Sequence, residues 1–111
     1  MKENIDKILN EIIEKLKRKY KPIKVILYGS YARGSPRDDS DIDLLILKKT
    51  NERRIERIVK VKKIIYNPER KIPISPLIYS PTELNERLEM GDDFIKEILK
   101  KGKILYEEPI S

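Results

Sequence analysis

Two carboxylates one residue apart, Asp41 and Asp43, stand at the start of the apolar run DIDLLIL. Successive side chains of a β-strand point to opposite faces, so both acids are expected on one side, with Ile42 turned into the core. Two carboxylates this close repel each other unless a cation lies between them. Mg²⁺ suits the pair, because it takes oxygen ligands and commonly combines one or two carboxylates with substrate phosphates.

The dipeptide Gly29-Ser30 is a second candidate for chemistry. It follows the apolar run at 23–28 and precedes a predicted helical turn at 31–34. A strand-to-helix junction offers backbone N–H groups, and glycine lets a phosphate approach closely. A phosphate cradle and a metal-binding acid pair on adjacent strands together predict a site for a nucleoside triphosphate.

Neither motif is specific by itself. A Gly-Ser pair is most often only a turn, and an Asp-x-Asp is most often a solvated strand end. Arg33 and Arg37 are likewise typical of surface charges. The combination is what favours a site, because ten residues separate Ser30 from Asp41 and each motif adjoins an apolar strand.

Composition narrows the chemistry further. The chain has 111 residues, which predicts a single domain over 1–111. It lacks Cys and His, so thiolate sites, disulfides and a histidine general base are excluded. A net charge of +6 favours a phosphate-bearing or polyanionic partner. No apolar run is long enough for a membrane span and no signal-peptide pattern is present, so a cytoplasmic protein is expected.

Hydrophobic spacing and breakers predict the elements that must position these residues. Pro76 falls inside one predicted strand and argues there for an edge position or a bulge. The predicted helices are an amphipathic one stopped by Pro22, then 52–66, a capped one from Ser80 to about Met90, and 92–101; the predicted strands are 23–28, 41–49, 72–80 and 103–107. This order predicts an α/β (α+β) fold, a small mixed sheet with helices packed against it.

The stretch GSYARGSPRDDSDIDLLI resembles the signature of the DNA polymerase β-like nucleotidyltransferase superfamily, in its minimal nucleotidyltransferase subgroup. That pattern is Gly-Ser, a short helix with a Gly, then Asp-x-Asp. The leading helix, the YSPTEL segment and the FIKEILKKGKILYEE tail are also similar to this subgroup. The resemblance covers essentially the whole chain and implies the nucleotidyltransferase fold.

The resemblance also implies roles for individual residues. Gly29 and Ser30 would hold the β- and γ-phosphates of ATP, and Asp41 and Asp43 would be the catalytic acids that ligate two Mg²⁺ ions. The remaining implied nucleotide-binding residues are Arg33 and Ser40. An acceptor hydroxyl would then attack the α-phosphate, and pyrophosphate would leave.

Members of this subgroup commonly act as the antitoxin of a toxin–antitoxin pair. The resemblance therefore implies a partner, a helical HEPN-family ribonuclease encoded nearby, which would be bound and adenylylated on a hydroxyl. The sequence leaves the oligomeric state open, with a homo-oligomer among the alternatives.

One position departs from the family pattern. A third carboxylate is usual on a neighbouring strand, and here that position falls on Ser75, followed by Pro76. One interpretation is a protein that binds Mg·ATP but transfers slowly or not at all, and so acts as a binding module that neutralises its partner by contact. Another is a substitute acid, with Asp38, Asp39 and Glu83 as candidates. A small misalignment is the third interpretation, but no acid lies between Lys71 and Thr82 to restore the pattern.

A third function class, nucleic-acid binding, rests on a basic stretch. A helix this basic is typical of a solvated face. Aromatic residues are only 6% of the chain, and no motif of stacked aromatics is present. Direct nucleic-acid binding is therefore not expected. The residues of this stretch are Arg53, Arg54, Arg57, Lys60, Lys62 and Lys63.

Overall fold

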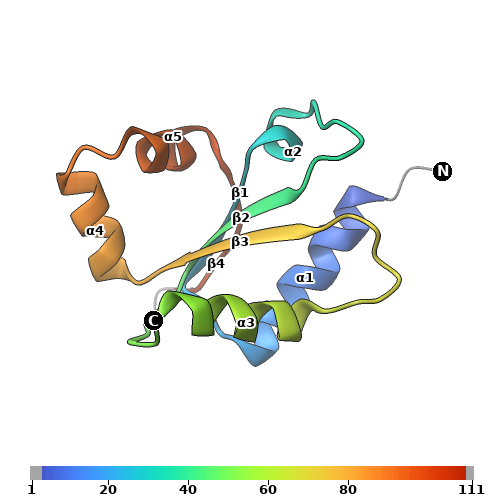
Figure 1. The fold of residues 1–111 in the computed structure, drawn as a ribbon, viewed down its shortest axis with the longest axis horizontal. Coiled ribbons are helices and arrows are strands. Elements are labelled where there is room, and N and C mark those ends of the chain that lie inside the picture. The colour runs from blue at the N-terminus through green and yellow to red at the C-terminus, as the bar shows by residue number, and fades with distance from the viewer. Residues whose placement is uncertain (1–3, 110–111) are drawn as a thin grey trace.

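A computed structural model of the chain describes residues 4–109 (Figure 1). Its helices and strands follow one another along the chain in the order that hydrophobic spacing predicts. They are α1 (Ile5–Lys19), β1 (Lys24–Tyr28), α2 (Ser30–Arg33), β2 (Ile42–Leu47), α3 (Arg54–Ile65), β3 (Ile74–Tyr79), α4 (Pro81–Glu89), α5 (Asp93–Lys101) and β4 (Lys103–Glu107). None of the helices within the described range is long and apolar enough to span a membrane.

The strands of residues 4–109 form one mixed sheet in the order β3-β2-β1-β4. β1 is antiparallel to both β2 and β4, whereas β2 and β3 run parallel. The parallel pair places Asp43 directly beside Ser75, and the antiparallel pair places Asp43 opposite Tyr28. The predicted mixed sheet is confirmed.

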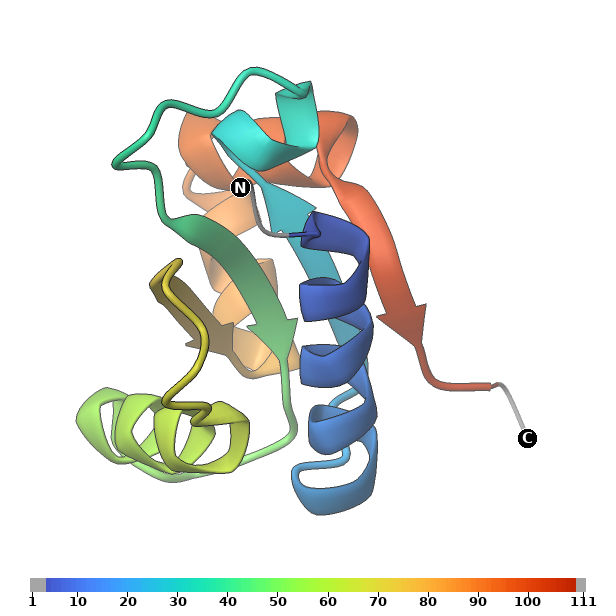
Figure 2. The ribbon, with the colours of Figure 1, turned by 90° about the vertical axis from the view of Figure 1, so that its right-hand side faces the viewer.

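Helices cover both faces of this sheet. α1 and α3 lie on one face, and α4 and α5 lie on the other (Figure 2). The first face buries Leu9, Ile12, Leu16, Val61 and Ile65 of the helices against Val25, Leu27, Ile42, Leu44 and Ile46 of the strands. The second buries Leu84, Ile95 and Ile98 of the helices against Ile26, Leu45 and Tyr79. This two-sided burial explains the nearly continuous apolar character of the central strand β2.

Local sequence signals account for several element ends. Ser80 and Glu83 form the predicted capping box at the start of α4, with Pro81 in its first turn. The side chain of Asp92 caps α5 by accepting a hydrogen bond from the backbone N–H of Ile95. Pro76 lies on the edge strand β3, where a missing backbone donor is tolerated, and β3 keeps an unshifted register with β2. Of the two predicted alternatives for Pro76, the edge position is therefore correct.

Helix α3 does not hold all of its basic residues on the solvated face that was expected for them. Arg57 is only 4% exposed, because its face of α3 packs on the sheet together with Val61 and Ile65. Two of the apolar residues that indicated the helix, Ile55 and Val59, are instead exposed. Hydrophobic spacing identified the helix, but it did not identify which face of the helix is buried, the one with Val61 and Ile65 or the one with Ile55 and Val59.

Candidate active site

Gly29 and Asp43 meet at the end of the sheet where β1 passes into α2. The backbone of Gly29 has φ 78° and ψ −156°, a region that is essentially restricted to glycine. A Cβ atom at this position would collide with Oδ2 of Asp43. The sequence therefore requires glycine here for two reasons, the backbone conformation and the close approach of a carboxylate.

The acid pair lies on the side of the sheet that α4 and α5 cover. Ile42 is fully buried on the opposite face, as expected from strand alternation, and Asp43 follows it in β2. Asp41 precedes the strand and is exposed, with its Oδ2 atom accepting a hydrogen bond from the hydroxyl of Ser75 at 3.4 Å. The structure thus brings Asp41, Asp43 and Ser75 together at the start of the parallel strand pair.

The electrostatics of Asp43 reflect this crowding. Burial raises the pKa of its carboxyl, the negative charge of Asp41 raises it further, and the positive charge of Arg33 opposes both. Burial, together with the nearby charge of Asp43 and the hydroxyl of Tyr79, raises the pKa of Tyr28 to about 12. At neutral pH the Tyr28 phenol is therefore protonated and available as a donor.

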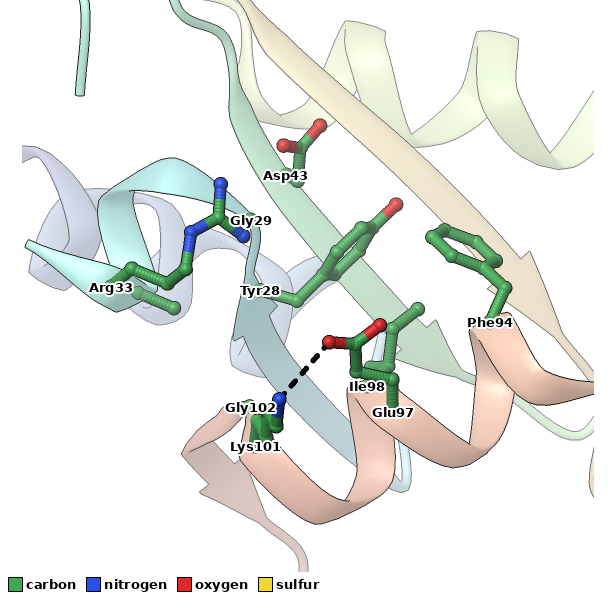
Figure 3. Close-up of a pocket in the computed structure, with 10 residues that line it drawn as sticks. Tyr28, Gly29, Arg33, Asp43, Phe94, Glu97, Ile98, Lys101 and Gly102 are labelled. Atoms are coloured by element: carbon green, nitrogen blue, oxygen red, sulfur yellow. Dashed lines mark hydrogen bonds and ion pairs between the residues drawn. The ribbon is translucent and has the colours of Figure 1, made fainter. Parts of the chain in front are cut away.

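A cavity of about 410 Å³ opens in front of Asp43 (Figure 3). Its size falls in the range of small-molecule sites. Its walls come from the end of β1, from α2, from the start of β2 and from one side of α5. The lining residues are Tyr28, Gly29, Ala32, Arg33, Asp43, Phe94, Glu97, Ile98, Lys101 and Gly102.

Of the other residues predicted to bind the nucleotide, Arg33 lines this cavity, whereas Ser30 and Ser40 are not among its lining residues. Arg33 lies on the last turn of α2. Ser30 is the first residue of α2, and its carbonyl accepts a hydrogen bond from the backbone N–H of Ser35, which closes the turn. Ser40 lies in the loop before β2, where its hydroxyl accepts a hydrogen bond from the N–H of Arg37 at 2.8 Å. A role for Ser30 or Ser40 in nucleotide binding remains a prediction.

A substitute for the third carboxylate is not found at Glu83. This residue lies beyond the far end of β3, whereas Ser75 and Asp43 lie near the starts of their strands. Its Oε1 atom is bound by the buried Arg57 at 2.6 Å and by the N–H of Ser80. Asp38 and Asp39 are exposed in the loop before β2. Within residues 4–109, no three acidic side chains gather closely enough to hold a metal ion together.

Comparison with known proteins assigns the chain to a family. A family model described as "Polymerase beta, Nucleotidyltransferase" matches residues 10–110. The chain belongs to this nucleotidyltransferase family. The resemblance of the GSYARGSPRDDSDIDLLI stretch is therefore confirmed at the level of the superfamily.

Curated relatives of this nucleotidyltransferase come from Methanocaldococcus jannaschii. "Putative protein adenylyltransferase MJ1305" is 36% identical over 108 residues, covering 93% of this chain and 72% of the relative. "Putative protein adenylyltransferase MJ0604" is 30% identical over 105 residues, covering 93% of this chain and 99% of the relative. Both alignments span most of the domain.

A solved structure shares the fold. It is described as a putative nucleotidyltransferase from Sulfolobus solfataricus, and it superposes with a TM-score of 0.63 at 21% identity. The match covers 92% of this chain and 79% of that chain. At this level of identity the likeness supports the nucleotidyltransferase fold.

Sequence reasoning missed the contribution of α5 to the site. Phe94 appeared only as an apolar position of a predicted helix, yet it lines the cavity and contacts Tyr28 edge-on, with ring centroids 5.7 Å apart. One available signal was the apolar excess of α5. This helix has four large apolar residues, of which only two are needed to pack against the sheet. Ile95 and Ile98 are buried, whereas Phe94 and Leu99 are exposed.

Proposed function

We propose that the chain binds Mg·ATP in the cavity at Gly29 and Asp43 and transfers AMP to a hydroxyl of a partner protein. The main support for this proposal is the contact between Gly29 and Asp43. It places a half-buried carboxylate against a backbone conformation that only glycine adopts readily. The names of the two relatives, each "Putative protein adenylyltransferase", support a protein acceptor.

The residues present fit a magnesium ion. Two carboxylates, Asp41 and Asp43, lie at one end of the sheet, and the pKa of Asp43 is raised by burial and, to a lesser extent, by the negative charge of Asp41. A hard cation that takes oxygen ligands from one or two carboxylates and from substrate phosphates relieves the repulsion between the two charges. When bound, Mg²⁺ would supply positive charge that stabilises the oxygens of an in-line phosphoryl displacement. The proposal is for two ions, as the resemblance implies.

The chain's own residues would contribute binding and orientation. Gly29 allows a phosphate to approach the backbone, and Arg33 adds positive charge at the rim of the cavity. Tyr28 and Phe94, whose rings meet edge-on, would form an aromatic wall of the cavity that Asp43 also lines. The acceptor hydroxyl would attack the α-phosphate, with its proton passing to a carboxylate or to solvent and pyrophosphate leaving.

The proposed partner is a HEPN-family ribonuclease encoded nearby, with this chain as the antitoxin of the pair in the cytoplasm. This partner assignment rests on the resemblance to minimal nucleotidyltransferases. The GSYARGSPRDDSDIDLLI stretch supports that resemblance, and the relatives' names support only that the acceptor is a protein. A direct contact with nucleic acid is not part of the proposal.

A second candidate function is a binding module that neutralises the partner by contact alone. Ser75 favours it, because the hydroxyl beside Asp43 and Asp41 is a much poorer ligand for Mg²⁺ than the carboxylate usual in the family. This candidate predicts that the cavity still binds nucleotide while transfer is weak.

Two variants, Asp41→Asn and Asp43→Asn, separate the two functions. Each is tested for complex formation with the neighbouring protein and for protection of cells that express it. For an adenylyltransferase, both variants keep the complex and lose protection, because the modification is abolished. For a contact-only module, both keep the complex and the protection.

A further inference from the structure

Phe94 is an aromatic side chain that the fold leaves half uncovered. It is the single Phe of the chain, and its side chain is 53% exposed although it lines the cavity in front of Asp43. Its ring meets Tyr28 at an interplanar angle of 80°, so the contact is edge-to-face. With half of its surface open, the Phe94 ring is free to contact a flat ligand.

The cavity has two ends of different chemistry. Gly29, Arg33 and Asp43 form a polar end, where the proposed function places the phosphates. The α5 residues form the other end, and Tyr28 lies between Arg33 and Phe94 (Figure 3). The residues that α5 contributes follow helical spacing i, i+3, i+4 and i+7, so one face of α5 is turned to the cavity. These residues are Phe94, Glu97, Ile98 and Lys101.

The same face of α5 carries polar groups beside the ring. Glu97 and Lys101 form an exposed ion pair of 3.3 Å. The pair supplies an acceptor and a donor one and two turns along α5 from Phe94, on the same wall of the cavity. An aromatic ring and polar groups on one wall suit the face and the edge of a heterocyclic base. Ile98, buried on the sheet, holds this face of α5 in place.

We infer that the α5 face is the nucleobase-binding wall of the pocket and that the Phe94 ring stacks on the base. This inference rests on the proposed function for the phosphate end of the same cavity. Stacking on an aromatic side chain changes the affinity for a base by roughly tenfold or more. The ligand class is a nucleoside triphosphate, with its base on α5 and its phosphates at the end of the cavity that Asp43 lines.

The test compares two probes that share a triphosphate but differ in the base. Isothermal titration with Mg²⁺ measures ATP and inorganic tripolyphosphate binding to the wild-type chain and to Phe94→Ala, Phe94→Leu and Phe94→Trp. Phe94→Leu keeps apolar bulk in α5 without a flat ring, which guards against a loss of folding. Leu99→Ala is the matched control, because Leu99 is a 39% exposed apolar residue of the same helix outside the cavity lining. Circular dichroism checks that each variant is folded.

We expect Phe94→Ala and Phe94→Leu to weaken ATP binding about tenfold, with tripolyphosphate binding unchanged. Phe94→Trp should restore ATP binding, and Leu99→Ala should change neither probe. Unchanged ATP affinity in folded Phe94→Leu would overturn the inference, as would an equal loss for both probes. A loss of affinity for the protein acceptor with ATP binding intact would overturn it too. Binding of neither probe by the wild-type chain would overturn the proposed function itself, and the inference with it.

Discussion

The hydroxyl of Ser75 lies 3.4 Å from Oδ2 of Asp41, and Ser75 pairs with Asp43 in the parallel register of β2 and β3. Ser75 therefore occupies the place from which a third carboxylate would reach both acids. β3 keeps a regular register with β2 despite Pro76, so the backbone at this position is not displaced. At the position where the resemblance implies a third carboxylate, the chain therefore carries a hydroxyl on an undisplaced strand.

Ser75→Asp should strengthen Mg²⁺ binding and raise adenylyl transfer on the order of tenfold, because a carboxylate is a far better ligand than a hydroxyl. Without Mg²⁺ the variant should be less stable than the wild-type chain, because three negative charges then lie together. Thermal unfolding with and without Mg²⁺, and transfer rates, check both parts. Thr82→Asp, an exposed position in α4, adds the same charge elsewhere as a control. Equal transfer by the two variants would contradict the role assigned to position 75.

Gly29→Ala should cost about 3 kcal/mol of stability or more and abolish nucleotide binding, because its backbone region is restricted to glycine and its Cβ meets Asp43. Gly34→Ala is a matched control. Gly34 also has a positive φ, of 75°, but a Cβ there meets nothing within 4 Å. Its cost should be near 1 kcal/mol, with nucleotide binding retained. Similar losses of stability in both variants, measured by denaturant unfolding, would show that Asp43 does not crowd Gly29.

Asp43→Asn should make the metal-free chain more stable at neutral pH. Burial and the charge of Asp41 raise the pKa of Asp43 in the folded state. A group with a raised folded-state pKa stabilises the fold below its unfolded pKa and loses that contribution as the pH rises through its folded pKa. The neutral amide removes this loss. Asp39→Asn, in the exposed loop, should leave stability unchanged. A lower melting temperature for Asp43→Asn would contradict the conclusion that the ionised carboxylate of Asp43 destabilises the metal-free fold.

Stability should fall in acid as Glu83 is protonated. Burial opposes its ionisation, but hydrogen bonds from Arg57 and Ser80 outweigh burial and lower the pKa of Glu83 to about 2, from 4.5. Its contribution is therefore complete above pH 4.5 and is lost as the pH falls toward 2. Melting temperatures across this range measure the loss.

Arg57→Met should reduce that acid-dependent loss and cost on the order of 2 kcal/mol at neutral pH, because a partly buried carboxylate loses its partner. Arg53→Met is the control on the same helix, since Arg53 is 82% exposed in its pair with Glu56. An equal effect of the two substitutions would show that burial of Arg57 adds nothing.

Much of this fold was predictable from local signals. Three features each depend on a few neighbouring residues: the alternation around Ile42, the capping box at Ser80, and the edge position that was one of the two alternatives for Pro76. The meeting of Gly29 and Asp43 was also predictable, because they lie at the ends of two consecutive strands that pair with each other.

The remaining features depend on tertiary packing. Arg57 resembled the other basic residues of α3 until the sheet buried its face of the helix. Glu83 was a candidate site acid, but the length of β3 carries it to the opposite end of the sheet. Phe94 joins the cavity because the α4–α5 segment folds back onto β1. The apolar excess of α5 indicates a second contact surface on this helix, but it does not specify what that surface contacts.

The most direct test of the account is the intact mass of the protein encoded by the neighbouring gene after incubation with this chain and Mg·ATP. We predict a mass increase corresponding to AMP on that protein, present with the wild-type chain, lost without Mg²⁺ and lost with Asp43→Asn. No mass increase with the wild-type chain would contradict the proposed adenylyl transfer. An equal increase with Asp43→Asn would contradict the assignment of the site to Asp43.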